Sequence, residues 1–168
     1  SEPIEDAPAS VSLVTSPELR AMRYPTVAEA VRGVRGVYVI DDTAYKTVGF
    51  RGFSRPGDYG NRILVLVDGH PVNDNWLWSS YTGYDLRADI EDVERIEVVR
   101  GPGSVLYGTG AFSGVINLIS HTRDTPDGRE IGVSAVDNGI ARARARLTHH
   151  WSRDAGVTTS IAMAKGGN

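Results

Sequence analysis

The first two thirds of the chain carry short apolar runs separated by turn residues, which predicts small strands and helices. The run over residues 62–67 is almost continuously apolar, a pattern typical of a strand that is buried on both faces. Asp68 and Gly69 follow it directly, and this pair is a strong signal for a tight turn. We therefore expect a hairpin directly after a central strand.

Helix signals come before most of the predicted strands. Ser16 and Pro17 have the order of a helix start, with Ser16 as the N-cap and Pro17 at the first helical position. Thr26 and Glu29 have the spacing of a capping box, and Gly33 is expected to end that second helix. Further strands are predicted at residues 11–15, 37–40, 47–53, 95–100 and 114–120, with a helical turn at 90–93. This order predicts an α+β fold.

The pattern changes beyond residue 121, where polar and apolar positions alternate with a period of two. Residues 142–151 place Arg142, Arg144 and Arg146 on one face of a strand, and residues 157–164 alternate as well. Such strands form outer-membrane barrels, and they also form soluble sandwiches and half-exposed antiparallel sheets. An arginine facing lipid costs about 2–4 kcal/mol at the bilayer midplane, so this face is expected to meet water or a lumen.

The composition indicates one globular core with an appendage and excludes several classes of function. The chain has 168 residues, 40% of them hydrophobic, and a formal net charge of -3. That charge argues against nucleic-acid binding, which needs a basic face. Without cysteine there are no disulfides, thiolate nucleophiles or Cys-based zinc sites. No apolar run reaches the length of a membrane-spanning helix, and any export signal would lie upstream of the first residues.

A glycine-rich segment over residues 101–114 raises the question of a phosphate site. A P-loop needs a lysine after its last glycine, and Thr109 stands at that position. A dinucleotide fingerprint needs a third glycine where this chain has Leu106. We therefore expect the segment to bind no nucleotide and to form a tightly folded backbone.

Motifs for catalysis and metal binding are missing from the sequence. There is no nucleophile elbow and no HExxH zinc motif. The four histidines are poorly spaced for a metal, and His149 and His150 would point to opposite faces of one strand. We predict no metal, no cofactor and no enzymatic reaction, with a soluble α/β enzyme kept open as one alternative.

Three motifs taken together resemble one known family. They are the Gly-Phe-Arg-Gly-Phe motif at 49–53, the apolar run with its turn at 62–73, and the stretch 94–120. In this order they resemble the plug domain of TonB-dependent outer-membrane receptors, over roughly residues 8–120. The resemblance implies a mixed plug domain at residues 1–121, followed at 122–168 by the first few strands of an incomplete β-barrel. In such receptors the plug lies inside a barrel of about 22 strands.

The resemblance also implies two groups of site residues. Arg51, Glu97 and Arg100 match a plug cluster that meets carboxylates on the barrel wall, while an ordinary salt bridge within the plug is the alternative. The candidate ligand contacts lie in two loops that face the external pocket in relatives, and they are Tyr45, Lys46, Trp76, Trp78, Tyr81 and Tyr84. Packing against the plug or the barrel is the alternative for these side chains.

The function implied is a plug that occludes the pore and helps to bind an iron–siderophore, haem, cobalamin or similar ligand for energised import. Its expected partners are the chain's own barrel, the ligand and the periplasmic TonB protein, although no TonB-engaging segment is evident in residues 1–10. The full-length protein is expected in the bacterial outer membrane and the present chain in solution, because an open sheet leaves edge groups unpaired in lipid. A periplasmic or secreted α+β binding module unrelated to a pore is the alternative.

Overall fold

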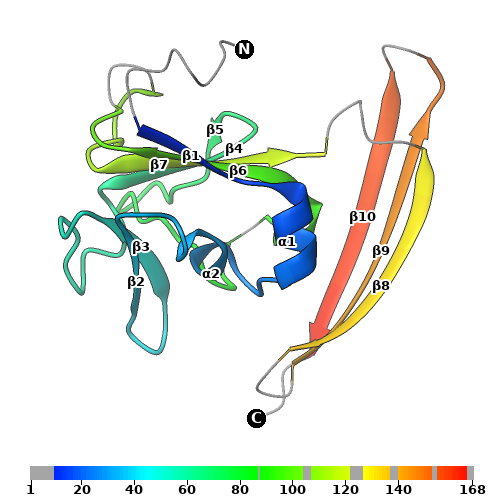
Figure 1. Cartoon of the computed structure of the whole chain (residues 1–168), viewed down its shortest axis with the longest axis horizontal. Helices are drawn as coiled ribbons and strands as arrows, with labels where there is room; N and C mark the ends of the chain where they lie inside the picture. The colour runs from blue at the N-terminus through cyan, green and yellow to red at the C-terminus, as the bar shows by residue number, and fades with distance from the viewer. Residues whose placement is uncertain are drawn as a thin grey trace. The chain divides into compact units, whose positions relative to one another are not determined.

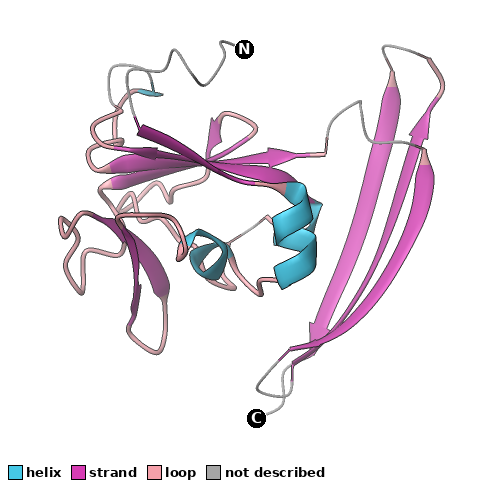
Figure 2. Cartoon of the chain, viewed as in Figure 1, coloured by secondary structure: helices cyan, strands magenta, loops and turns pink. Residues whose placement is uncertain are grey.

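The computed structural model describes residues 10–86, 88–103, 107–121, 127–136, 140–152 and 155–165. The chain forms two compact units, Ser1–Ser120 and His121–Asn168. The first unit combines short helices with a mixed sheet, and the second consists of antiparallel strands (Figures 1 and 2). The predicted α+β fold class is confirmed.

The first unit is built on a sheet with the strand order β1-β6-β7-β4-β5 in the described part of the chain. These strands are β1 (Ser10–Val14), β4 (Ile63–Val67), β5 (His70–Pro71), β6 (Val93–Arg100) and β7 (Gly114–Ser120). β4 runs parallel to β7, and the other neighbours are antiparallel. The turn predicted at Asp68 and Gly69 joins β4 to β5, and both residues have positive φ.

Two helices and a hairpin lie on one side of this sheet (Figure 1). They are α1 (Ser16–Met22), α2 (Val27–Val31) and the antiparallel pair β2 (Val37–Asp41) and β3 (Lys46–Phe50). A 3-10 turn, η2 (Ile90–Asp92), leads into β6 at the position where a helical turn is predicted. All of these elements are short, so tertiary contacts rather than helix propensity must stabilise them.

The helix starts differ in detail from the sequence prediction. The N-cap of α1 is Thr15, one residue before the expected Ser16. Thr26 is the N-cap of α2 as predicted, but its hydroxyl donates to the Glu29 carboxylate and makes no bond to the helix backbone. The capping box is therefore incomplete, because Glu29 turns instead toward Lys46 of β3, with 2.5 Å between Oε1 and Nζ.

The apolar run of β4 is buried on both faces, as its sequence pattern predicts. Ile63 and Val65 belong to the main core, which lies on the side of the helices and the hairpin. Leu64 and Leu66 point the other way and pack with Val99 in a second, smaller core. Burying one such side chain stabilises the fold by about 1.5–3 kcal/mol. β4 therefore contributes to the stability of both cores.

The second unit is an antiparallel sheet with the order β10-β9-β8 in its described residues. The strands are β8 (Gly128–Val136), β9 (Ile140–His150) and β10 (Gly156–Lys165). On one face, Arg144 and Arg146 each bind Glu130, at 2.7 and 2.5 Å. The opposite face is apolar and exposed within this chain, with Ile131, Val133, Leu147, Ile161 and Met163. The predicted alternation of the two faces is confirmed.

Candidate functional site

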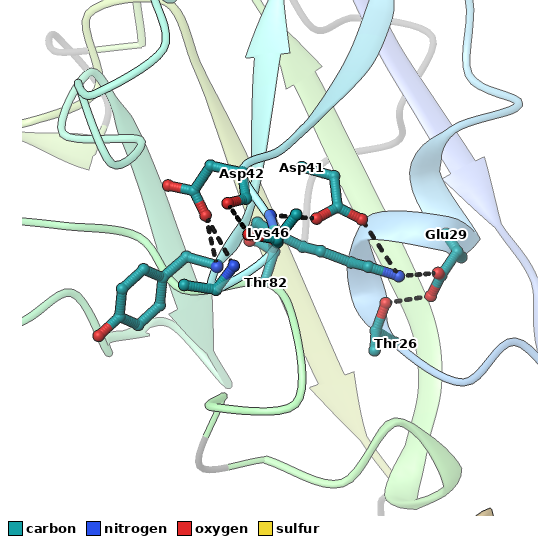
Figure 3. Close-up of polar contacts among 9 residues, drawn as sticks. Thr26, Glu29, Asp41, Asp42, Lys46 and Thr82 are labelled. Atoms are coloured by element: carbon teal, nitrogen blue, oxygen red, sulfur yellow. Dashed lines mark hydrogen bonds and ion pairs between the residues drawn. The ribbon is translucent and has the colours of Figure 1, made fainter. Parts of the chain in front are cut away.

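The tip of the β2–β3 hairpin, which carries two of the candidate ligand residues, is held by its own aspartates (Figure 3). The Asp42 carboxylate accepts hydrogen bonds from the backbone N–H of Ala44 at 3.1 Å and of Tyr45 at 2.6 Å. The Asp41 carboxylate accepts from the N–H of Thr43 at 3.0 Å. Aspartate side chains favour tight turns in this way, so the hairpin itself holds the backbone at Tyr45 in place.

Lys46 is engaged inside the plug and does not project freely from the loop. Its ammonium lies 2.5 Å from the Glu29 carboxylate of α2 and 3.8 Å from the Asp41 carboxylate (Figure 3). The hydrogen bond that the Lys46 ammonium donates to Glu29 raises the pKa of Lys46 above its usual value. The sequence pattern suggests a ligand contact at this position, and the structure gives the side chain an internal partner.

Three tyrosines from three separate segments meet near this hairpin. The ring of Tyr45 lies 5.9 Å from that of Tyr59 in an edge-on arrangement and 5.6 Å from that of Tyr81 in a tilted one. Sequence reasoning identifies Tyr45 and Tyr81 but misses Tyr59. The available signal for Tyr59 was its place in the turn-rich loop Pro56-Gly57-Asp58-Tyr59-Gly60, a few residues after the Arg-Gly motif.

Buried hydroxyl groups on either side of Tyr81 join these three segments. The Thr82 hydroxyl donates to the Lys46 carbonyl at 2.9 Å, and the Ser80 hydroxyl donates to the Gly60 carbonyl at 2.8 Å. The Ser80 N–H donates to the Tyr59 carbonyl at 3.0 Å. Ser80 and Thr82 are buried, and Tyr81 between them is half-buried with its ring beside that of Tyr45.

The tryptophan loop is organised by Asp74, which sequence reasoning does not single out. Its carboxylate accepts from the backbone N–H groups of Trp76 and Leu77, both at 2.8 Å, and from that of Ser79 at 2.7 Å. Trp76 is 91% exposed, so its ring is available for contact, and Tyr84 is exposed too. Trp78 instead turns back and packs against the second core.

Acid is expected to loosen this loop. The backbone donors hold the pKa of Asp74 below its usual value of 3.8, so the carboxylate's contribution to loop order is complete above that value. It should be lost as the pH falls through the depressed pKa, because a protonated carboxyl is a poorer acceptor. Trp fluorescence between neutral and strongly acidic pH measures the change, and Asp74→Ala should abolish it. An identical acid transition in that variant would contradict this role.

A pocket of about 770 Å³ opens beside the Trp78 loop in the first unit. Its walls are mainly aromatic and apolar and include two arginines. The lining residues include Phe50, Arg51, Phe53, Arg62, Leu77, Trp78, Pro102 and Phe112. Phe53 and Phe112 are exposed, and the sequence patterns identify neither of them as a pocket residue.

The structure brings together two of the three residues predicted for the charge cluster. Arg51 and Arg100 line a second pocket of about 490 Å³, together with Arg35 and Gly36. The Arg100 guanidinium donates to the Arg35 carbonyl at 2.9 Å. No carboxylate lines this pocket in the described part of the chain. Its described lining therefore makes the pocket a basic recess.

Glu97 lies apart from these two arginines. It is three residues before Arg100 on β6, and side chains at that spacing point to opposite faces of a strand. Its carboxylate binds Arg95 at 3.0 Å and accepts a hydrogen bond from the Asn117 amide at 3.2 Å. Glu97 thus has partners within the plug.

The glycine-rich segment serves close packing in its described part; residues 104–106 lie outside the described residues. A Cβ on Gly114 would lie 2.6 Å from the Val99 carbonyl oxygen and 2.8 Å from the Phe50 ring. Gly110 has φ +95, and a Cβ there would meet the Trp78 indole at 2.0 Å. These glycines let the backbone approach its neighbours where any side chain would collide.

Among the described residues there is no group of three or more His, Asp or Glu side chains that could hold a metal ion. In the same part of the chain, no helix has the length and apolar content needed to cross a bilayer.

The comparisons identify the class of protein to which this fold belongs. Residues 3–115 match the TonB-dependent Receptor Plug Domain family. The chain therefore belongs to the plug domain family of TonB-dependent receptors, as its motifs predict. This membership argues against both alternatives, the pore-independent binding module and the soluble enzyme.

Individual relatives are outer-membrane receptors and transporters, not enzymes. The iron-regulated outer membrane virulence protein of Vibrio cholerae is 34% identical over 70% of this chain and 18% of its own length. The ferrienterobactin receptor of Escherichia coli is 35% identical over 66% of this chain and 16% of its own length. The vitamin B12 transporter BtuB of Vibrio vulnificus is 25% identical over 99% of this chain and 24% of its own length. The chain thus spans a quarter or less of these relatives.

Solved structures share the fold across nearly the whole chain. FpvA of Pseudomonas aeruginosa, bound to pyoverdines, superposes with a TM-score of 0.77 at 20% identity, over 97% of this chain and 21% of its own. The siderophore receptor PiuA of Acinetobacter baumannii gives a TM-score of 0.73 at 22% identity, over 99% of this chain and 22% of its own. The strands of the second unit therefore also have counterparts in receptors of this class.

Proposed function

We propose that this chain occludes the pore of an outer-membrane receptor and helps to bind a ligand for energised import. The observation that carries the proposal is the match of residues 3–115 to the plug family. The ligand class is an iron–siderophore, haem, cobalamin or similar compound, in line with the relatives named as ferrienterobactin receptor and vitamin B12 transporter. The full-length protein then resides in the bacterial outer membrane and works with periplasmic TonB.

Residues 1–121 act in this proposal as the plug domain and residues 122–168 as the first strands of the surrounding barrel. The two faces of the β8–β10 sheet support the second assignment. An exposed apolar face suits lipid, while a face of ion-paired arginines suits a lumen. The same exposed face in water would be an unusual surface for a soluble domain.

Arg51 and Arg100 are proposed to meet carboxylates of the barrel wall. Their shared basic recess supports this role, because a guanidinium binds a carboxylate through two parallel hydrogen bonds and keeps its charge when buried. Glu97 takes no part in this recess, because it binds Arg95 and Asn117 on the other face of β6.

Two loops are proposed to contact the ligand. Tyr45, Tyr81 and Tyr84 contribute from around the hairpin, and Trp76 contributes from the tryptophan loop. Lys46 and Trp78, which the sequence also suggests, are engaged within the plug and take no part in this proposal. Exposure supports Trp76 best, because its ring makes little contact with the plug and would gain contact area from a bulky organic ligand.

Calorimetric titration of the full-length receptor with iron–siderophores, haem and cobalamin tests this function. One of these compounds should bind, and Trp76→Ala should weaken that binding by about fivefold or more, which is about 1 kcal/mol. Trp151→Ala, a change of an exposed tryptophan in the second unit, is the matched control and should leave the affinity unchanged. Failure of the whole panel to bind would contradict the proposed import function, and unchanged affinity in Trp76→Ala would remove Trp76 from the site.

A further inference from the structure

We propose that the rings of Tyr45, Tyr59 and Tyr81 form the ligand-contacting face of the plug, and that this face selects an uncharged metal complex over a polyanionic one. The inference rests on the proposed function, since it names the ligand class for the same loops. It also adds Tyr59 to the site.

The three rings offer one aromatic surface. Tyr45 lies between the others, with ring centroids at 5.9 Å from Tyr59 and 5.6 Å from Tyr81. Each ring keeps part of its surface open to solvent. Tyrosine gives a large contact area with few rotatable bonds, and its hydroxyl both donates and accepts hydrogen bonds. Such a surface suits the amide, hydroxamate or ring periphery of an organic chelate.

The backbone under the rings is fixed before any ligand arrives. Tyr45 is positioned by Asp42, and Tyr59 and Tyr81 are joined through Ser80. A site that is ordered in advance loses little conformational entropy on binding. The face can therefore contribute affinity without first being reorganised.

The charged residues of the segments that carry the three tyrosines disfavour an anion. The Lys46 ammonium is held between the carboxylates of Glu29 and Asp41. Arg62 is bound to Asp58, with 3.4 Å between Nε and Oδ2. Acidic residues outnumber basic ones in the segments that carry the rings, which are 41–46, 54–62 and 79–86, together with Glu29 of α2. The acids are Glu29, Asp41, Asp42, Asp58 and Asp85, and the bases are Lys46, Arg55 and Arg62.

This balance leaves a surplus of negative charge. Lys46 and Arg62 are already in ion pairs with carboxylates. Among the charged residues of these segments this leaves one cation, Arg55, and two carboxylates, Asp42 and Asp85. A trianionic chelate would meet repulsion here and would need cations that are already committed to carboxylates. An uncharged complex needs only the aromatic contacts and hydrogen bonds that the tyrosines supply.

Titration of the full-length receptor with uncharged and anionic probes tests the inference. The uncharged probes are an iron(III) tris-hydroxamate chelate and cyanocobalamin, and the anionic probe is a trianionic iron(III) tris-catecholate chelate. We expect one uncharged probe to bind at least about tenfold more tightly than the anion. Tyr59→Ala should weaken that binding by about fivefold or more. Tyr107→Ala, a partly exposed tyrosine on a different segment, is the control and should have no effect.

The outcomes separate this inference from the proposed function. Tighter binding of the trianionic chelate, lost in Arg55→Gln, would overturn the charge selection while leaving an import receptor in place. Binding of an uncharged probe that Tyr59→Ala does not change would overturn the assignment of the tyrosine face. Binding of none of the probes would overturn the inference, whereas the proposed function would fail only if haem and the other siderophores also failed to bind.

Discussion

Replacing Phe50 by alanine is expected to lower the free energy of unfolding of the first unit by about 3–5 kcal/mol. Phe50 ends β3, is only 1% exposed and packs in the main core. Its ring also lies against Gly114 of β7, where the backbone of the sheet comes close enough that no side chain fits. Alanine would leave a large cavity between the hairpin and the sheet that it covers, and the packing between them would be lost.

Urea unfolding followed by tryptophan fluorescence measures this loss. The experiment uses a Trp151→Phe background, so that Trp76 and Trp78 report on the first unit alone. Phe53→Ala is the matched control, because Phe53 is 65% exposed and lies three residues further along the chain. Its effect should stay below about 1 kcal/mol. Equal effects of the two substitutions would show that Phe50 is not a core residue.

Replacing Asn73 by alanine should cost about 3 kcal/mol, a large effect for a polar side chain. Asn73 is buried, and its carbonyl accepts from the Val65 N–H at 2.9 Å. Its amide donates to the carbonyls of Ile63 and Trp78, both at 2.9 Å. Alanine would leave two buried backbone groups and one half-buried carbonyl without this partner, and each buried group costs about 1–3 kcal/mol.

Two further variants sharpen this prediction. Asn73→Asp keeps the acceptor for Val65 but places a carboxylate against two carbonyl oxygens, so it should also destabilise the unit. Asn75→Ala, two residues away and exposed, is the control and should change stability little. Urea unfolding in the Trp151→Phe background gives the free energies. An unchanged free energy of unfolding in Asn73→Ala would mean that the Trp78 loop is not anchored through this amide.

Much of the fold could be predicted from the pattern of residues alone. The continuous apolar run at 62–67 determined a strand with both faces buried, and the Asp-Gly pair after it determined the turn. The alternation at 142–151 determined which side chains share a face of β9. Each of these is a local matter, because strand periodicity and turn geometry depend on neighbours in the sequence.

The candidate site could be predicted only in part. The aromatic loops and the Arg-Gly motifs pointed to Tyr45, Trp76, Arg51 and Arg100. The partners of those residues could not be found, because the ion pair between Lys46 and Glu29 joins residues seventeen positions apart on different elements. A side chain's partner at such a distance depends on how the elements pack.

The sequence by itself therefore determined the family, the order of the elements and the polarity of each strand face, since all three are carried by short motifs and residue spacing. Only the tertiary structure decided that Tyr59 joins Tyr45 and Tyr81, that Arg51 and Arg100 share a recess, and that Glu97 faces the other way. The physical reason is that hydrogen bonds and side-chain contacts act over a few ångströms. Segments remote in the sequence come within that range only when the core of the first unit closes.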